Sequence, residues 1–82
     1  MSNPRDLDGK STAEVEAIAR AALSALAQRD DVDAFGALLA MNAHLAECTA
    51  ISAQQLSSSM SWTQIGNLAG TSRQNAWSRW SN

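Results

Sequence analysis

The stretch that decides the fold lies near the C-terminal end of the chain and reads SWTQIGNLAGTSRQNAWSRW over residues 61–80. Ser61 and Thr71 are each followed three positions later by Gln. This is the spacing of a capping box, in which the two side chains bind the free backbone groups at the start of a helix. Gly70 stands just before the second box, where a left-handed residue ends one helix and turns the chain into the next. The stretch therefore predicts two short helices joined by a tight turn.

A glycine inside the first of these helices indicates how the two helices meet. Ile65, Leu68 and Ala69 form the expected buried face, and Gly66 lies among them. A glycine in a helix interior costs roughly 1 kcal/mol relative to alanine. A close crossing of two helices is the usual reason for a glycine there, and a pair joined at about 90–120° is the helix-turn-helix of DNA-binding proteins. We therefore expect residues 61–80 to form a helix-turn-helix.

Residues 62–77 closely resemble the segment W-x-x-I-G-x-x-L-G-x-S-R-Q-x-A of small helix-turn-helix regulators from bacteria and phages, of the actinobacterial type. These regulators are similar in style to region 4 of sigma factors. Ala69 stands where Leu is usual, and Thr71 stands where Val is usual. The resemblance implies that the helix 72–80 enters the major groove of duplex DNA.

The side chains of this last helix divide into an inward and an outward face. At roughly 100° per residue, Ala76 and Trp80 share the face expected to pack on Ile65 and Leu68. Arginine suits guanine and glutamine suits adenine in the major groove, while hydroxyl groups and the free amides of a helix N-terminus suit phosphate. The residues that the resemblance implies contact DNA are Thr71, Ser72, Arg73, Gln74, Asn75, Trp77, Ser78 and Arg79.

The two bulky aromatic residues near this face have different expected roles. The Trp77 ring has three possible places: stacked in the groove, across a subunit interface, or in the core beside Trp80. The core or the interface is favoured. Trp62 is expected in the core, because the first position of the motif packs under the second helix.

The first helix is expected to begin after Ser11, which forms a third capping box with Glu14. Its apolar residues recur at three- and four-residue steps, which predicts an amphipathic core helix. They are Val15, Ile18, Ala19, Ala22, Leu23 and Leu26.

A second, longer helix is expected to start at Asp31 or Asp33 and to run about 25 residues, as far as the tract 57–59. At about 1.5 Å per residue it approaches 40 Å, which is longer than so small a domain needs. Such a helix usually packs against a second copy, and Asn42 on its apolar side is suited to fix the register. The apolar positions along this helix include Phe35, Leu38, Leu39, Asn42, Leu45, Ala46, Thr49, Ile51 and Leu56.

The predicted organisation is an all-α chain of four helices. Residues 1–10 form a flexible arm, and residues 11–82 form one helix-turn-helix domain. Within that domain, residues 11–58 are the helical dimerisation part and residues 61–80 are the helix-turn-helix.

Composition narrows the function classes. The chain has 82 residues, 45% of them apolar, with one cysteine and one histidine. His44 and Cys48 are four residues apart, but no second pair accompanies them, so we expect no metal, no disulfide and no cofactor. No nucleophile with an acid-base pair and no phosphate loop is recognisable, so an enzyme and a small-molecule site are not expected. The longest apolar run, 37–41, is too short for a bilayer span, which favours a cytoplasmic protein without membrane contact.

Charge sets the last condition on function. The net charge is −2, yet all eight acidic residues lie between Asp6 and Glu47, and residues 48–82 contain Arg73 and Arg79 and no acid. Two arginines give weak affinity for phosphate. The sequence thus predicts a homodimeric, sequence-specific regulator of repressor type that binds duplex DNA. The alternative is a protein-interaction adaptor or anti-regulator that uses its acidic helices and whose helix-turn-helix does not bind DNA.

Overall fold

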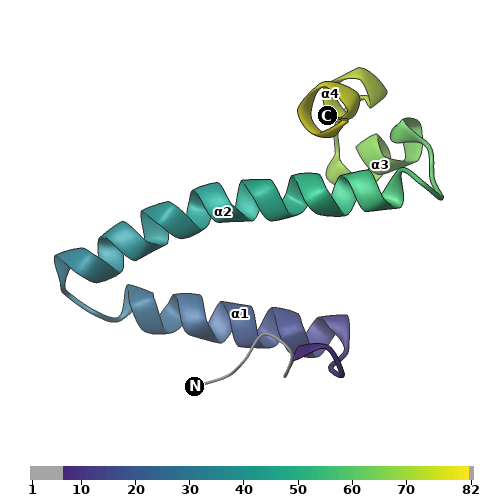
Figure 1. Cartoon of the computed structure of the whole chain (residues 1–82). Helices are drawn as coiled ribbons and strands as arrows, with labels where there is room; N and C mark the ends of the chain where they lie inside the picture. The colour runs from purple at the N-terminus through teal and green to yellow at the C-terminus, as the bar shows by residue number, and fades with distance from the viewer. Residues whose placement is uncertain (1–6, 82) are drawn as a thin grey trace. The chain divides into compact units, whose positions relative to one another are not determined.

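The computed structural model describes residues 7–81, and within that range it contains four α-helices and no strand (Figure 1). The all-α prediction with four helices is therefore confirmed. Of the predicted arm, residues 1–6 lie outside the described residues, while 7–10 form a turn in which the Lys10 N–H donates to the Leu7 carbonyl at 3.0 Å. The helices are α1 Thr12–Ala27, α2 Val32–Leu56, α3 Trp62–Ala69 and α4 Arg73–Trp80.

Side chains fix the starts of the first two helices. The Ser11 hydroxyl accepts from the Glu14 N–H at 3.2 Å, and the Glu14 carboxylate accepts from the Ser11 N–H at 3.4 Å. The Asp31 carboxylate accepts from the Ala34 N–H at 2.6 Å, so Asp31 rather than Asp33 caps α2. Both helices begin where the sequence predicts, because a cap depends only on residues within one turn.

The chain divides into two compact units, Met1–Ala40 and Met41–Asn82. In the first unit, α1 and the start of α2 run in opposite directions (Figure 1). Ala34 is buried there, but α1 has no buried residue, and Ile18 and Leu23 are exposed. The apolar side of α1 exists as predicted, but the prediction of a core helix is wrong for this chain by itself. Periodicity identifies an apolar side without showing what covers it.

The second unit has a small core at the meeting point of α2, α3 and α4. Ala53, Ile65 and Ala76 are buried, and Met60, Trp62 and Trp80 pack against them. Trp62 therefore lies against the core, as expected.

The predicted buried face of α3 is partly wrong. Leu68 is 72% exposed and Ala69 is also exposed, whereas Gly66 is buried beside Ile65. The reason is the line of closest approach to α4, which passes through Ile65 and Gly66. Leu68, one turn along, is left at the rim.

Among the described residues, α2 is the one helix long and apolar enough to cross a membrane by length and composition alone. Core helices of soluble proteins pass the same test. The expectation based on the run 37–41 took no account of apolar residues spaced along the rest of the helix. A cytoplasmic location without membrane contact therefore stays a prediction.

Removing the cap of α3 should destabilise the second unit. The Ser61 hydroxyl accepts from the Gln64 N–H at 3.1 Å, and the Gln64 side chain accepts from the Ser61 N–H at 2.9 Å. We expect Ser61→Ala to lower the free energy of unfolding by about 1 kcal/mol, because it leaves the Gln64 N–H without its acceptor. Urea unfolding followed by far-UV circular dichroism measures the change.

The matched control is Ser59→Ala, whose hydroxyl only donates to the Leu56 carbonyl at a long 3.4 Å. Its effect should stay within about 0.5 kcal/mol, as for ordinary surface substitutions. Equal losses in the two variants would contradict the assigned cap.

Candidate nucleic-acid interface

The turn between α3 and α4 is closed by two backbone hydrogen bonds. Gly70 has φ +70° and ψ +30°, the left-handed conformation that the sequence predicts. Its N–H donates to the Asn67 carbonyl at 3.2 Å, and the Thr71 N–H donates to the Gly66 carbonyl at 2.8 Å. This pair of bonds is the Schellman arrangement, which satisfies the last carbonyl groups of α3 and ends it.

Gly66 is the position where α3 comes closest to the chain that leads into α4. A Cβ atom on Gly66 would lie 2.9 Å from the carbonyl oxygens of both Thr71 and Ser72. These are backbone atoms that cannot rotate away. The close approach that the sequence predicts at Gly66 is therefore present, and it is made to the backbone at the start of α4.

The start of α4 differs by one residue from the prediction. Ser72, with an extended backbone, is the cap, and its hydroxyl accepts from the Asn75 N–H at 3.1 Å. The capping box predicted at Thr71 with Gln74 is therefore wrong, and the helix begins at Arg73 rather than at residue 72. The cause is the turn, which uses the Thr71 N–H for its closing bond. The Thr71 hydroxyl instead accepts from the Asn75 side-chain amide at 3.3 Å.

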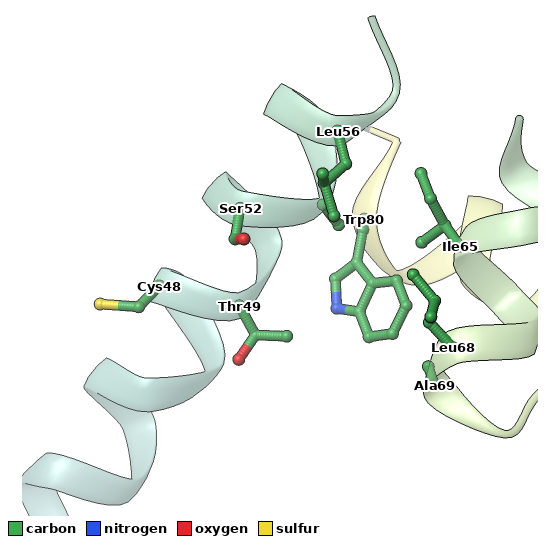
Figure 2. A pocket seen from close by; sticks show the side chains of 9 residues that line it. Cys48, Thr49, Ser52, Leu56, Ile65, Leu68, Ala69 and Trp80 are labelled. Carbon is green, nitrogen blue, oxygen red and sulfur yellow. The ribbon is translucent and has the colours of Figure 1, made fainter. Parts of the chain in front are cut away.

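The inward face of α4 agrees with the sequence. Ala76 is fully buried, and Trp80 is partly buried against the same core. Figure 2 shows the Trp80 indole between side chains of α2, among them Thr49, and Ile65 and Leu68 of α3. The Trp80 ring thus links the last turn of α4 to both neighbouring helices, and this fixes which side of α4 faces outward.

Six of the eight predicted contact residues lie on α4 and are exposed: Arg73, Gln74, Asn75, Trp77, Ser78 and Arg79. Arg79 is on the side of α4 toward α2, where it lines a hollow with Asn42, Leu45 and Trp80. Three of the six, Arg73, Gln74 and Trp77, also line one shallow hollow on the surface. Thr71 and Ser72 precede the helix, and Ser72 serves as its cap. The structure thus brings together one guanidinium, one amide and one indole on a single exposed surface, which we call the α4 surface.

Trp77 does not lie in the core. The sequence favours either the core or a subunit interface for Trp77. Its side chain is 52% exposed, so the core position is wrong, and the interface position stays a prediction. The residue that closes the core is Trp80, one turn further on. Sequence spacing identifies Trp80 as inward, but it does not distinguish a groove contact from an interface contact for Trp77.

The charge near the α4 surface is positive. Within residues 41–81 the acidic residue is Glu47, while Arg73 and Arg79 both belong to α4. The Arg79 guanidinium carbon lies 6.0 Å from the centre of the Trp80 ring, at the limit of a cation–π contact.

His44 and Cys48 adjoin each other on α2, with the His44 Nε2 3.5 Å from the Cys48 Sγ, and both are exposed. In the described part of the chain no group of three or more histidine, cysteine or acidic residues is placed to hold a metal ion. The absence of a metal and of a cofactor stays a prediction.

Comparisons with models of protein families, with curated proteins and with solved structures gave no match. The resemblance of residues 62–77 to small regulators is therefore not tested by them, and the function must be argued from the residues.

A methyl group on Gly66 should push the start of α4 away from α3, because there is no room for it. We expect Gly66→Ala to lower the free energy of unfolding by about 1–3 kcal/mol, as overpacking usually does, although alanine favours helix. The measurement is urea unfolding followed by far-UV circular dichroism and tryptophan fluorescence.

Asn67→Ala is the control, since Asn67 is exposed and next to Gly66 on the same helix. It should leave stability unchanged or raise it slightly, because alanine is the better helix former. A Gly66→Ala protein as stable as the Asn67→Ala protein would refute the close approach.

Proposed function

We propose that this protein is a homodimeric, cytoplasmic DNA-binding regulator and that α3 and α4 form a helix-turn-helix, with α4 in the major groove of duplex DNA. The observation that carries the proposal is the α4 surface: Arg73, Gln74 and Trp77 lie together on the exposed side of a helix whose other side is held by Ala76 and Trp80. A rigid inward face and a polar, cationic outward face are what a recognition helix requires.

The dimensions of α4 support this proposal. With its side chains an α-helix is about 10–12 Å across, which fits the major groove of about 12 Å, and the eight residues of α4 give a length of about 12 Å along the groove. Arg73 and Gln74 occupy its first turn, the part of a recognition helix that reaches base edges. The amides at the start of the helix are donors without partners in the helix itself, and they suit a phosphate group.

The charge of one copy limits its affinity. The cations of residues 48–82 are Arg73 and Arg79, so one copy neutralises few phosphates. Its affinity for DNA is therefore low and changes little with salt concentration. Two copies related by a two-fold axis would double these contacts on half-sites about one helical turn apart. We therefore include the homodimer in the proposal.

The second candidate function is a protein-interaction adaptor or anti-regulator. It is favoured by the acidic residues between Asp6 and Glu47, and by large apolar side chains exposed on α1 and α2. In that case the pair α3 and α4 would not touch DNA, and the acidic helices would bind another protein.

Arg73→Ala tests DNA readout. An arginine that binds guanine through two hydrogen bonds contributes about 1–3 kcal/mol, so the dissociation constant for a selected DNA fragment should rise about 5- to 150-fold. Mobility shifts against genomic fragments at low and at moderate salt measure the change, and circular dichroism verifies the fold.

Arg29→Ala is the matched control, because it removes the same charge from the segment between α1 and α2. It should change the dissociation constant less than threefold, a limit of about 0.6 kcal/mol. Equal losses in the two variants would show that net charge alone governs binding. No binding by the unmodified protein at low salt would refute the DNA function and favour the adaptor.

A further inference from the structure

One side of α2 in the first unit is apolar and uncovered. The exposed fractions are 85% for Val32, 64% for Phe35 and 59% for Leu39. These residues are spaced by three and four positions, so their side chains lie along one side of the helix. Burying a large apolar side chain is a main source of stability. These three side chains are mostly uncovered within this chain, so they contribute little to its stability.

Gly36 lies beside these side chains, and because it has no side chain of its own it leaves a hollow in their row. A Cβ atom on Gly36 would meet nothing within 4 Å, in contrast to Gly66, where it would meet backbone. A glycine inside a helix weakens the helix relative to alanine, and packing within the chain gives no reason for it here. A second molecule that packs closely against α2 at this position would explain why a glycine stands there. We call Val32, Phe35, Gly36 and Leu39 the α2 face.

We propose that the α2 face binds the same face of a second copy of this chain, with the two α2 helices antiparallel and Phe35 of each copy seated over Gly36 of the other. Val32 and Leu39 lie at equal distances from the midpoint between Phe35 and Gly36. A two-fold axis at that midpoint therefore places Val32 of one copy opposite Leu39 of the other. The α2 face carries both the projecting side chain and the hollow that receives it, so it is complementary to itself, as a two-fold interface requires.

The charges at the start of α2 favour the antiparallel arrangement. Asp30, Asp31 and Asp33 stand at or just before the first turn of the helix. Parallel pairing would bring the two acidic ends together, whereas antiparallel pairing separates them and aligns the two helix dipoles favourably. A bilayer is a poorer occupant of the α2 face, since α2 also carries the exposed Asp33 and Glu47, which are costly in lipid.

The area of the α2 face sets the strength of pairing. Its three large side chains offer roughly 60–120 Å² each, so two copies bury on the order of 400–700 Å², below the usual area of a stable complex. The pairing is therefore weak and reversible, and it depends on protein concentration. It rests on the two-copy form of the proposed function, in which both recognition helices bind one operator.

Sedimentation velocity of the full chain without DNA, over micromolar to several hundred micromolar concentrations, tests the proposal. We expect a monomer–dimer equilibrium in the unmodified protein. Phe35→Ser and Gly36→Leu should each raise the dimer dissociation constant at least tenfold. Gly36→Leu is the sharper variant, because leucine strengthens the helix and adds apolar surface, so only filling of the hollow explains a loss of dimer. Circular dichroism verifies that the helices persist.

The matched control is Ile51→Ser, since Ile51 is a similarly exposed apolar residue of α2 on another side of the helix. It should leave the dissociation constant within twofold of the unmodified protein. The orientation is tested in a Cys48→Ser background, where Val32→Cys and Leu39→Cys proteins should form a disulfide with each other when mixed. Disulfides between two copies of the Val32→Cys protein would instead indicate parallel pairing.

A monomer at every concentration, a dimer unaffected by Gly36→Leu, or equal losses in the Ile51→Ser protein would each overturn the proposal. So would flotation of the protein with phosphatidylcholine vesicles in place of self-association. The sedimentation experiment contains no DNA, so it tests only the pairing of two chains. A protein that forms the dimer but binds no DNA in the mobility-shift assay would contradict the proposed function and not this inference. A monomer that binds DNA would overturn this inference and the homodimer in the proposed function, but it would leave the proposed DNA binding by α4 standing.

Discussion

The contact between Gly66 and the carbonyl oxygens of Thr71 and Ser72 is the constraint on which the described arrangement of α3 and α4 depends. It sets how closely the turn approaches α3, and so the direction in which α4 leaves it. An isolated eight-residue helix is unstable in water. The outward face of α4 therefore exists because the turn, Ala76 and Trp80 hold its other face against α2 and α3.

The elements that the sequence predicts correctly are set by residues within about one turn of each other. The caps at Ser11, Asp31 and Ser61 and the left-handed Gly70 need no knowledge of the rest of the chain. The start of α4 is misplaced by one residue for a similar reason. The bond from the Thr71 N–H to the Gly66 carbonyl spans five residues, and a count of capping-box spacings does not include it.

Burial is less predictable, because it depends on partners distant in sequence or on another molecule. The spacing on α1 shows which side is apolar, but no residue of α1 is buried. Leu68 was expected on a buried face, and Trp77 in the core or at a subunit interface. Both are exposed in this chain, where Ile65, Gly66 and Trp80 lie against the core. For the candidate site, the sequence thus identifies the outward polar residues well and the environment of the large apolar ones poorly.

A single copy has little buried apolar surface and few cations, and pairing of two copies would increase both. A chain this short buries a small fraction of its apolar surface, and the described residues bury Ala34, Ala53, Ile65 and Ala76 as their hydrophobic core. The same chain has two arginines on the helix proposed to bind DNA and an acidic remainder. Pairing of two copies would cover exposed apolar side chains and also double the cations available to one operator. Stability and DNA affinity would then rise with the same concentration of protein, because both depend on the fraction of chains that are paired.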